Sequence, residues 1–586
     1  MERSHKQQRL IDRIFPFLTW LRTYQPAYLK NDALAGLTVA VVLIPQAMAY
    51  AMLAGLPPVY GLYAGAVSPL IGALWGSLRQ LATGPIAIMS LLVLTTLTPI
   101  AEPGSQEFIE LSFLLAFLVG VIYLLIGFFR FGFIMAFISH SAVKGFTSAA
   151  SLIIISTQLP HLFGIQIERH EYMFPKLLAI IQGIPGLHLP TLGIGLLAMG
   201  IIYGIKKFKP TFPAALVALV VTTLLVYGLK LTESGVAIVG KSQGGLPMPA
   251  LPPFDFDMLF YLIGPAVVLA LVSFAETYSV GKSISADTKQ KLDVDQEFIG
   301  QGFANLVGSF FQCYPVSGSF SRTAINFASG ARTGISSVIT TGSVVIALLF
   351  LTPLLTHIPK AALAALVITA VLMLFHPREV FRLWKMNRHD GIVAICVFTL
   401  ALISKPDYAL MIGILMSLVF FLWKTMRPRI VRIAKDPELN MFVNADIFNK
   451  PGCPQILHLR SDNSIYFANA EYTIERILER LDEIDTPAKY LLLDLQAMAF
   501  IDITGINELR VLQEEVQGKE IELALMEIHR PVKEVMQSSG FLEEMNPELL
   551  LQKRGEAITV LFQHLDHDYC KNVCPHTLFF ECKTVK

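Results

Sequence analysis

Long apolar segments recur along most of this 586-residue chain, and they constrain its fold more than any other feature. Apolar runs of roughly 17–25 residues are long enough to cross a bilayer as helices. We count about fourteen such runs between Leu34 and Trp423, of which two or three are too short or too broken to be ordinary spans. Hydrophobic residues make up 54% of the chain and charged residues only 16%. The sequence therefore predicts a polytopic α-helical membrane protein.

The distribution of basic residues predicts how the spans are oriented. Lys and Arg are enriched in cytoplasmic loops, and here basic loops alternate with loops such as the acidic EPGSQEFIE after Ala101. An even number of spans with the N-terminus inside puts the basic loops on one side, so both termini are predicted to be cytoplasmic. The first residues lack the pattern of a cleaved signal peptide. We expect a multi-pass protein of the plasma membrane, specifically a bacterial inner membrane.

Charge and motifs exclude several functional classes. The formal net charge is only +1, and no Lys/Arg cluster is interleaved with aromatic residues, so nucleic acid is not an expected partner. The chain contains no GxxxxGK[ST] loop, which argues against ATP-driven transport. We find no nucleophile with a base at a recognisable spacing, so the chain is not expected to be an enzyme.

After Lys435 the pattern changes to alternating strands and helices, which indicates one compact α/β domain. The strand-like ILHLRSD and SIYFANA precede the helical TIERILERL, and LLLDL and IELALMEI are each followed by a helical pattern. The sequence thus divides into a cytoplasmic N-terminal segment (1–32), a transmembrane domain (33–426), a linker (427–440), the α/β domain (441–565) and a Cys- and His-containing tail (566–586).

Two of the apolar segments are interrupted in the same way. In RQLATGPIAIMSLLVLTTL, Gly84 and Pro85 precede an apolar run too short for a full span. Because Pro favours the first turn of a helix, an extended strand is predicted to turn here into a half-helix. VSGSFSRT (316–323) is similarly rich in Ser and Gly, and AINFASGA can begin a second short helix. Paired interrupted segments indicate a transporter site at the bilayer midplane.

Two charges lie inside this predicted membrane region. Half-helix N-termini present free N–H groups and a positive dipole end, and Arg322 adds a cationic fork of donors, which together suit an oxyanion. Glu276 lies in VVLALVSFAETYSVGKSIS, and a buried carboxylate near an Arg can change protonation as an anion enters and leaves. The alternatives are that Arg322 reaches a lipid headgroup or pairs with an acid, and that Glu276 and Arg322 form a permanent structural ion pair.

Three separated motifs in this order carry a resemblance to a known family. GLPPVYGLYAGAVSPLIGALWGSLRQLATGPIAIMSLL (55–92) resembles the signature of the SulP anion transporters, the sulfate-permease family, which includes mammalian anion exchangers and prestin. Residues 307–337 are similar to the family's tenth-helix region and closest to plant-type sulfate symporters. SIYFANAEYTIERIL and LLLDLQAMAFIDITGINEL resemble its STAS domain. The resemblance implies fourteen spans as a seven-plus-seven inverted repeat with core and gate domains, alternating access and homodimers.

The resemblance also implies which residues form the site. Gln46, Tyr50, Ala87, Ser321 and Arg322 are expected to bind the substrate, and Glu276 is expected to couple transport to protons. Gln46 and Tyr50 are four residues apart and share one helix face; ordinary hydrogen bonding between helices is the alternative for both. The motif PPVYGLYAG (57–65) is expected to be structural, because its prolines end the first span and its small residues allow close helix packing.

The expected activity is secondary active, proton-coupled import of sulfate or a similar small oxyanion by alternating access. A bicarbonate or C4-dicarboxylate transporter of the same family is one alternative. An uncoupled anion exchanger or channel is another, and it would not need Glu276 to titrate. A nucleobase permease of a different family is the third, although the STAS domain and the Ser321-Arg322 pair argue against it.

The cytoplasmic domain suggests regulation or assembly rather than chemistry. Its loop Asp502-Ile503-Thr504-Gly505 corresponds to the Asp-Ser-Ser-Gly loop that is phosphorylated in related antagonists of bacterial anti-sigma factors. Thr504 aligns with the acceptor and is a candidate regulatory residue; the alternative is that Thr504 caps a helix. The domain is expected to hold a dimer together or to dock a cytoplasmic protein partner.

The tail carries an unexpected set of soft ligands. Cys570, Cys574, His576 and Cys582, with His567 nearby, offer thiolates and imidazoles for a zinc or iron–sulfur site. Their spacing matches no standard zinc finger, and a reducing cytoplasm argues against disulfides. The alternative is a tail that simply packs on the STAS domain. Transport itself is expected to require no cofactor.

Overall fold

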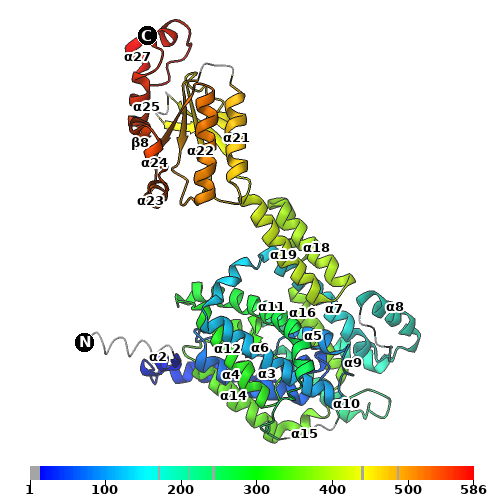
Figure 1. Cartoon of the computed structure of the whole chain (residues 1–586). Coiled ribbons are helices and arrows are strands. Elements are labelled where there is room, and N and C mark those ends of the chain that lie inside the picture. The colour runs from blue at the N-terminus through cyan, green and yellow to red at the C-terminus, as the bar shows by residue number, and fades with distance from the viewer. Residues whose placement is uncertain are drawn as a thin grey trace. The chain divides into compact units, whose positions relative to one another are not determined.

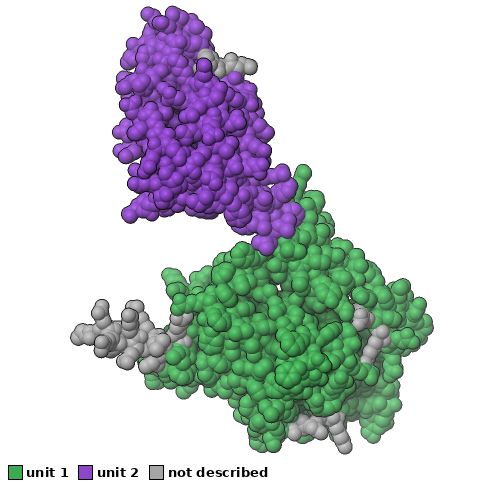
Figure 2. Space-filling view, in the orientation of Figure 1, with its two compact units in different colours: residues 1–417 green, residues 418–586 purple. Residues whose placement is uncertain are grey.

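The computed structural model describes residues 14–168, 170, 172–209, 212–240, 245–436, 438, 441–484 and 488–586. Residues 1–13 of the predicted cytoplasmic segment (1–32) lie outside the described residues, as do positions 437, 439 and 440 of the predicted linker. The chain divides into two compact units, Met1–Ser417 and Leu418–Lys586 (Figure 2).

Unit 1 is built almost entirely of helices (Figure 1). Within the described residues they are α2 (Phe17–Arg22), α3 (Tyr28–Leu53), α4 (Pro58–Trp75), α5 (Ala87–Leu97), α6 (Gln106–Phe128), α7 (His140–Phe163), α8 (Met173–Gly183), α9 (Leu189–Phe208), α10 (Ala214–Gly228), α11 (Phe256–Thr288), α12 (Val294–Phe310), α13 (Phe320–Ala328), α14 (Ile335–Ile346), α15 (Thr352–Leu355), α16 (Lys360–Val371), α17 (Pro377–Met386), α18 (Arg388–Ile403) and α19 (Pro406–Thr425), which continues into unit 2.

The length and apolarity of these helices confirm a polytopic membrane fold. Across the described part of the chain, eight helical stretches are long and apolar enough to cross a membrane, and α5 and α10 are shorter apolar helices. Large apolar side chains also lie on the outside of the unit: Leu224 is 66% exposed and Phe260 is 72% exposed. An apolar outer surface of this kind is the surface that lipid chains cover.

The PPVYGLYAG segment connects and packs the first two long helices. α3 ends at Leu53, Pro57 is the N-cap of α4, and Pro58 is the first residue of α4. A Cβ atom added at Gly61 would lie 1.9 Å from the carbonyl oxygen of Ala47. No side chain fits in that space, so Gly61 is the residue that lets α4 approach the α3 backbone.

Both interrupted segments form the predicted arrangement of a short strand followed by a half-helix. β1 (Thr83–Gly84) precedes α5, and β2 (Ser317–Gly318) precedes α13. The two strands pair antiparallel, with Thr83 opposite Gly318 and Gly84 opposite Ser317. Because the strands run in opposite directions, the two half-helices begin on opposite sides of one small ladder and their N-termini face each other across it.

Unit 2 is a six-stranded sheet covered by helices on both faces (Figure 1). The strand order is β4-β3-β5-β6-β7-β8; β5 to β8 are parallel, and β3 pairs antiparallel with both β4 and β5. Its strands are β3 (Ile430–Asp436), β4 (Met441–Asn444), β5 (Ile456–Ser461), β6 (Tyr490–Asp494), β7 (Glu522–Met526) and β8 (Leu550–Leu551). Its helices are α20 (Ala445–Phe448), α21 (Ala470–Asp482), α22 (Ile503–Gly518), α23 (Arg530–Ser538), α24 (Phe541–Glu544), α25 (Arg554–Gln563), α26 (His567–Asn572) and α27 (Cys582–Val585).

The central strand β6 shows why both faces of this sheet are covered. Leu491 and Leu493 belong to the core beneath α21 and α22, whereas Tyr490 and Leu492 belong to the core that contains α25 and Phe579 of the tail. Successive residues of a strand point to opposite faces, so a continuous apolar strand requires a layer of helices on each side.

Two local features of unit 2 differ from the sequence prediction. β3 lies within residues 427–440, which the sequence predicts as a linker, so this stretch forms part of the sheet. SIYFANA is not a strand: it makes one bridge, Ile465 with Ile501, and then turns. Asn469 causes the turn, because its side chain accepts a hydrogen bond from the Tyr466 N–H at 2.9 Å and donates one to the Ser464 carbonyl at 2.9 Å.

Candidate functional site

A cavity of about 800 Å³ lies in unit 1 where the two half-helices begin. Residues of α3, α5, α7, α9, α11 and α13 line it. Five of the six residues that the resemblance implied for the membrane site are among them, namely Gln46, Tyr50, Ala87, Glu276 and Ser321. The tertiary structure thus brings together positions that lie up to 275 residues apart in sequence.

The two half-helices differ in how their first turns are capped. Ile86, the N-cap of α5, provides no side-chain cap, so the first N–H groups of α5 have no such partner. In α13, Ser319 is the N-cap, and its hydroxyl accepts a hydrogen bond from the Arg322 N–H at 3.4 Å. Ser319, Ile86 and Ala87 all line the cavity. Both positive helix ends are therefore available to an anion in it.

Arg322, the sixth residue that the resemblance implied for the membrane site, is 1% exposed and is not among those that line the cavity, although its chain neighbour Ser321 and its hydrogen-bond partner Gln46 both line it. Its Nη1 donates a long hydrogen bond of 3.4 Å to Oε1 of Gln46, while Nε and Nη2 have no hydrogen-bond partner among the described residues. A Cβ atom added at Gly84 would lie 3.1 Å from Nη2, so the guanidinium passes directly beside β1. Buried charges are normally paired. A guanidinium with two unused donor groups at a cavity is suited to bind an anionic oxygen pair.

Glu276 is half-buried in the wall of the cavity, on α11. Its Oε2 atom is buried and has no hydrogen-bond partner within the described part of the chain. Glu276 and Arg322 interact electrostatically, but neither the unused donors of Arg322 nor Oε2 of Glu276 engage the other residue. The permanent hydrogen-bonded ion pair considered as an alternative is therefore not formed in this structure.

A polar scaffold that the sequence did not indicate holds the β1–β2 ladder in place. Asn305 of α12 accepts a hydrogen bond from the Val316 N–H at 2.8 Å and donates one to the Val316 carbonyl at 2.9 Å. Gln301, one turn earlier, donates to the Thr83 hydroxyl at 2.9 Å. From α11, Thr277 bonds to the Ser317 hydroxyl at 2.8 Å and accepts from the Gly318 N–H at 3.0 Å. The i, i+4 spacing of Gln301 and Asn305, which puts both amides on one face of α12, is the signal that sequence reasoning could have used.

Asn305 gives a direct test of this scaffold. We expect Asn305→Ala to lower the free energy of unfolding by at least about 2 kcal/mol, because it leaves the buried N–H and C=O of Val316 without partners. Thermal unfolding of the purified full chain in detergent measures the effect. Ser343→Ala is the matched control, since among the described residues the Ser343 hydroxyl bonds only to the Ile339 carbonyl of its own helix. Equal stability of the two variants would contradict a scaffolding role for Asn305.

The cavity also has a basic lining that the sequence analysis did not assign to the site. His140 and Lys144 of α7, Lys206 of α9, Lys282 of α11, and His376 all line it, and Glu276 is the one acidic residue that does so in the described chain. These residues are dispersed in sequence and lie mostly near helix ends, where basic residues are common for topological reasons. Their convergence on one cavity gives it a positive potential.

In unit 2 the cap of α22 is Asp502 rather than Thr504. The Asp502 carboxylate accepts hydrogen bonds from the Gly505 N–H at 2.8 Å and from the Phe467 N–H at 2.8 Å. Thr504 is the second residue of the helix and is exposed. The prediction that Thr504 caps the helix is wrong, because Asp502 already satisfies the N–H that a cap must bind. The regulatory role of Thr504 remains a hypothesis.

Two half-helices that start at one cavity within a bundle of membrane-spanning helices are an arrangement typical of membrane transporters. Comparison with known proteins identifies the family of transporters. The model of the Sulfate permease family matches residues 29–397, and that of the STAS domain matches residues 448–556. The chain therefore belongs to the sulfate permease family, a family of anion transporters and not of enzymes.

Individual relatives agree with this assignment over almost the whole chain. Sulfate transporter 4.1, chloroplastic, from Arabidopsis thaliana is 33% identical and covers 96% of this chain and 84% of its own length. High affinity sulfate transporter 1 from Stylosanthes hamata is 31% identical, and the match covers 93% of this chain and 85% of that protein. The solved structure of SLC26A9 has a TM-score of 0.87 at 24% identity and covers 97% of this chain and 96% of that one, so it shares the fold. The transmembrane domain of the cyanobacterial bicarbonate transporter BicA matches 67% of this chain with a TM-score of 0.57.

Proposed function

We propose that this protein imports sulfate, or a similar small oxyanion, together with protons by alternating access. The observation that carries the proposal is the buried, incompletely paired guanidinium of Arg322 beside the cavity at the start of both half-helices. A planar fork of donors next to two helix N-termini matches an anion that presents several oxygens.

Sulfate is the substrate that the relatives support. Proteins named as sulfate transporters share 30–33% of their residues with this chain over most of its length. Gln46, Tyr50 and Ser321 add polar side chains to the cavity wall, and hydroxyl and amide groups of this kind can bind the oxygens that Arg322 leaves free. Arg322 with Gln46, Tyr50, Ala87 and Ser321 is thus the proposed anion site.

Proton coupling is assigned to Glu276. Its carboxylate lines the cavity, interacts electrostatically with Arg322 and has a buried oxygen without a hydrogen-bond partner among the described residues. Arrival of an anion at Arg322 neutralises the nearby positive charge that favours ionised Glu276, so the carboxyl group takes up a proton. The anion and the proton would then cross together.

The basic cavity lining supports an orientation in which the cavity faces the cytoplasm. Lys206 and His376 border loops that the distribution of Lys and Arg assigns to the cytoplasm, and Lys282 marks the cytoplasmic end of its helix. In this orientation the structure is the inward-facing state of the transport cycle, in a bacterial inner membrane with both termini cytoplasmic. A homodimer, and a STAS domain that assembles it or docks a cytoplasmic partner, complete the proposal.

Flux measurements in proteoliposomes test the proposed activity. Uptake of labelled sulfate, bicarbonate and succinate is measured with and without an inward proton gradient, and protein-free vesicles and a protonophore serve as controls. We expect sulfate to accumulate above equilibrium only when the gradient is present. If bicarbonate or succinate accumulates instead, that anion is the substrate and not sulfate. Equal sulfate fluxes with and without the gradient would show that the protein is an exchanger or channel and not a symporter.

The lysines of the cavity wall are expected to attract the anion from the cytoplasmic side. In inside-out vesicles at low ionic strength, Lys144→Gln combined with Lys282→Gln should slow sulfate uptake roughly threefold to tenfold, because both changes reduce the positive potential of the cavity. The deficit should shrink at high salt, where charges are screened. Lys230→Gln, an exposed position outside the cavity lining, is the control. A deficit that is independent of salt would show that these lysines act through structure and not through charge.

A further inference from the structure

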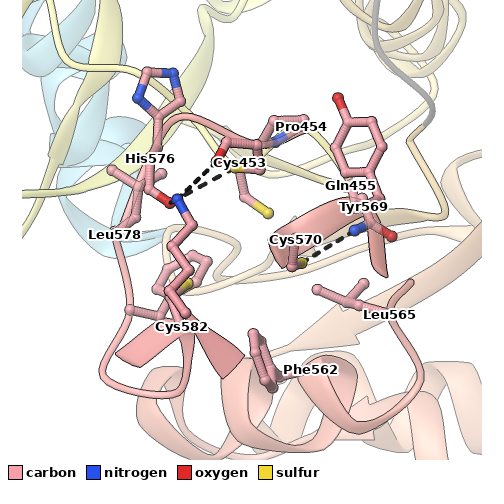
Figure 3. Close-up of a pocket in the computed structure, with 13 residues that line it drawn as sticks. Cys453, Pro454, Gln455, Phe562, Leu565, Tyr569, Cys570, His576, Leu578 and Cys582 are labelled. Carbon is pink, nitrogen blue, oxygen red and sulfur yellow. Dashed lines mark hydrogen bonds between the residues drawn. The ribbon is translucent and has the colours of Figure 1, made fainter. Parts of the chain in front are cut away.

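Four of the six cysteines in the chain gather in one place in unit 2, far from the membrane cavity in sequence and in role. Cys453 precedes β5, Cys570 lies on α26, Cys574 follows that helix, and Cys582 begins α27. All four line the same small pocket. Figure 3 shows the labelled side chains of Cys453, Cys570 and Cys582 reaching it from three separate segments.

Polar contacts hold these segments around the pocket. Gln455 donates hydrogen bonds to the Asp566 carbonyl at 2.9 Å and to Sγ of Cys570 at 3.2 Å, and it accepts one from the Asp566 N–H at 2.8 Å. At the other end of the tail, Nζ of Lys586 donates to the carbonyls of Cys574 at 2.7 Å and His576 at 2.8 Å. The loop before β5 and the tail are therefore joined as one substructure.

The size of the pocket limits what it can contain. Its free volume is about 10 Å³, which is roughly the space of one water-sized sphere. Besides the thiols, its lining consists of five apolar residues, namely Pro454, Phe562, Leu565, Leu578 and Phe579, and four polar ones, namely Gln455, Tyr569, His576 and Lys586. A single soft cation fits, whereas an iron–sulfur cluster is too large.

The tail has little regular structure with which to hold itself together. α26 has 6 residues and α27 has 4, and no helix or strand forms between them. Small substructures of this kind are commonly stabilised by a metal ion or a disulfide.

We propose that Cys453, Cys570, Cys574 and Cys582 bind one structural zinc ion that fastens the C-terminal tail to the sheet of the STAS domain. Zn²⁺ favours four thiolate ligands in a closed tetrahedral site, and each thiol gives up its proton to solvent on binding. The described residues do not present three ready-made ligands, so the thiols turn about χ1 toward the pocket when the ion binds. The tail sequence suggested His576 as the fourth ligand, but its imidazole points away from the labelled sulfur atoms (Figure 3). Cys453 is the fourth ligand in this proposal instead.

Metal analysis of the purified full chain tests this site. The chain is purified in detergent from cells grown with zinc, and its metal content is measured by mass spectrometry. We expect one zinc per chain in the wild type, in His576→Ala and in Cys396→Ser, whose thiol lies on α18 in unit 1. Each of Cys453→Ser, Cys570→Ser, Cys574→Ser and Cys582→Ser should lose the zinc.

Cobalt provides a readout that does not depend on the variants. After a chelator removes zinc from the wild-type chain, added Co²⁺ should produce a thiolate-to-cobalt charge-transfer band, and zinc should displace it. A wild-type chain with neither zinc nor this band overturns the proposal, as does a Cys453→Ser variant that retains full zinc content. Neither outcome depends on whether the chain transports sulfate.

Discussion

Arg322→Met is expected to abolish sulfate uptake while making the anion-free protein more stable. A charge-assisted hydrogen bond contributes about 1.5–3 kcal/mol, so loss of one such contact weakens anion binding roughly 10-fold to more than 100-fold. In the anion-free protein, however, the guanidinium is 1% exposed and two of its nitrogens have no partner among the described residues. Replacing an incompletely paired buried charge by an apolar side chain of similar volume should raise the free energy of unfolding by at least about 1 kcal/mol.

Two measurements and one control separate binding from structure in this experiment. Thermal unfolding is recorded with and without sulfate, and uptake is measured in proteoliposomes. Wild-type protein should be stabilised by sulfate, whereas Arg322→Met should be more stable at the start and gain nothing from sulfate. Arg322→Lys keeps the positive charge but lacks the planar pair of N–H donors of the guanidinium, so this variant should bind sulfate with intermediate affinity. An Arg322→Met protein that is destabilised yet still transports would show that Arg322 is structural.

Glu276→Gln is expected to remove proton-driven accumulation while preserving anion exchange. The amide has nearly the shape of the carboxylic acid but cannot ionise, so the variant resembles a permanently protonated transporter. The anion site at Arg322 and the half-helix ends should remain intact. With an inward proton gradient, we therefore expect sulfate to equilibrate without concentrating, a loss of accumulation of at least roughly tenfold for a gradient of one pH unit and one coupled proton.

Counterflow measurements supply the control for this variant. Vesicles preloaded with unlabelled sulfate should take up labelled sulfate through Glu276→Gln at close to the wild-type rate, because exchange needs no net proton movement. Glu297→Gln provides a second comparison: Glu297 is another buried acid of unit 1, but it bonds to the Ser77 N–H at 2.9 Å and does not line the cavity. Retained accumulation in Glu276→Gln would place coupling elsewhere.

Much of the fold follows from local sequence patterns. Apolar runs predict the membrane spans because a helix in lipid must be apolar along its length. The breaks at Gly84-Pro85 and at VSGSFSRT predict the two half-helices, since Pro and Gly disrupt a helix wherever they occur. Local patterns were less reliable in unit 2: SIYFANA has strand-like composition, but the side chain of Asn469 bonds the backbone into a turn.

The residues whose role depends on distant partners were the ones that local patterns missed. Asn305 looks like an isolated polar residue until α12 is placed against Val316, the residue just before β2. Thr504 was a candidate N-cap because Thr is a common N-cap residue. Asp502 is the actual N-cap of α22, and its carboxylate accepts the hydrogen bond from the Gly505 N–H. Cys453 is 117 residues before Cys570 in the chain and joins the tail cysteines only in the folded sheet.

By itself, the sequence determined that this is a polytopic membrane protein with a STAS domain, two half-helices and two charges in its membrane region. Those properties depend on the apolarity, backbone preference or charge of residues close together in the chain. Only the tertiary structure decided that Gln46, Ala87, Glu276 and Ser321 surround one cavity, and that Arg322 and Glu276 remain unpaired with each other there. The reason is physical: pairing and enclosure depend on distances between separate helices, which packing of the whole unit sets and no short segment encodes.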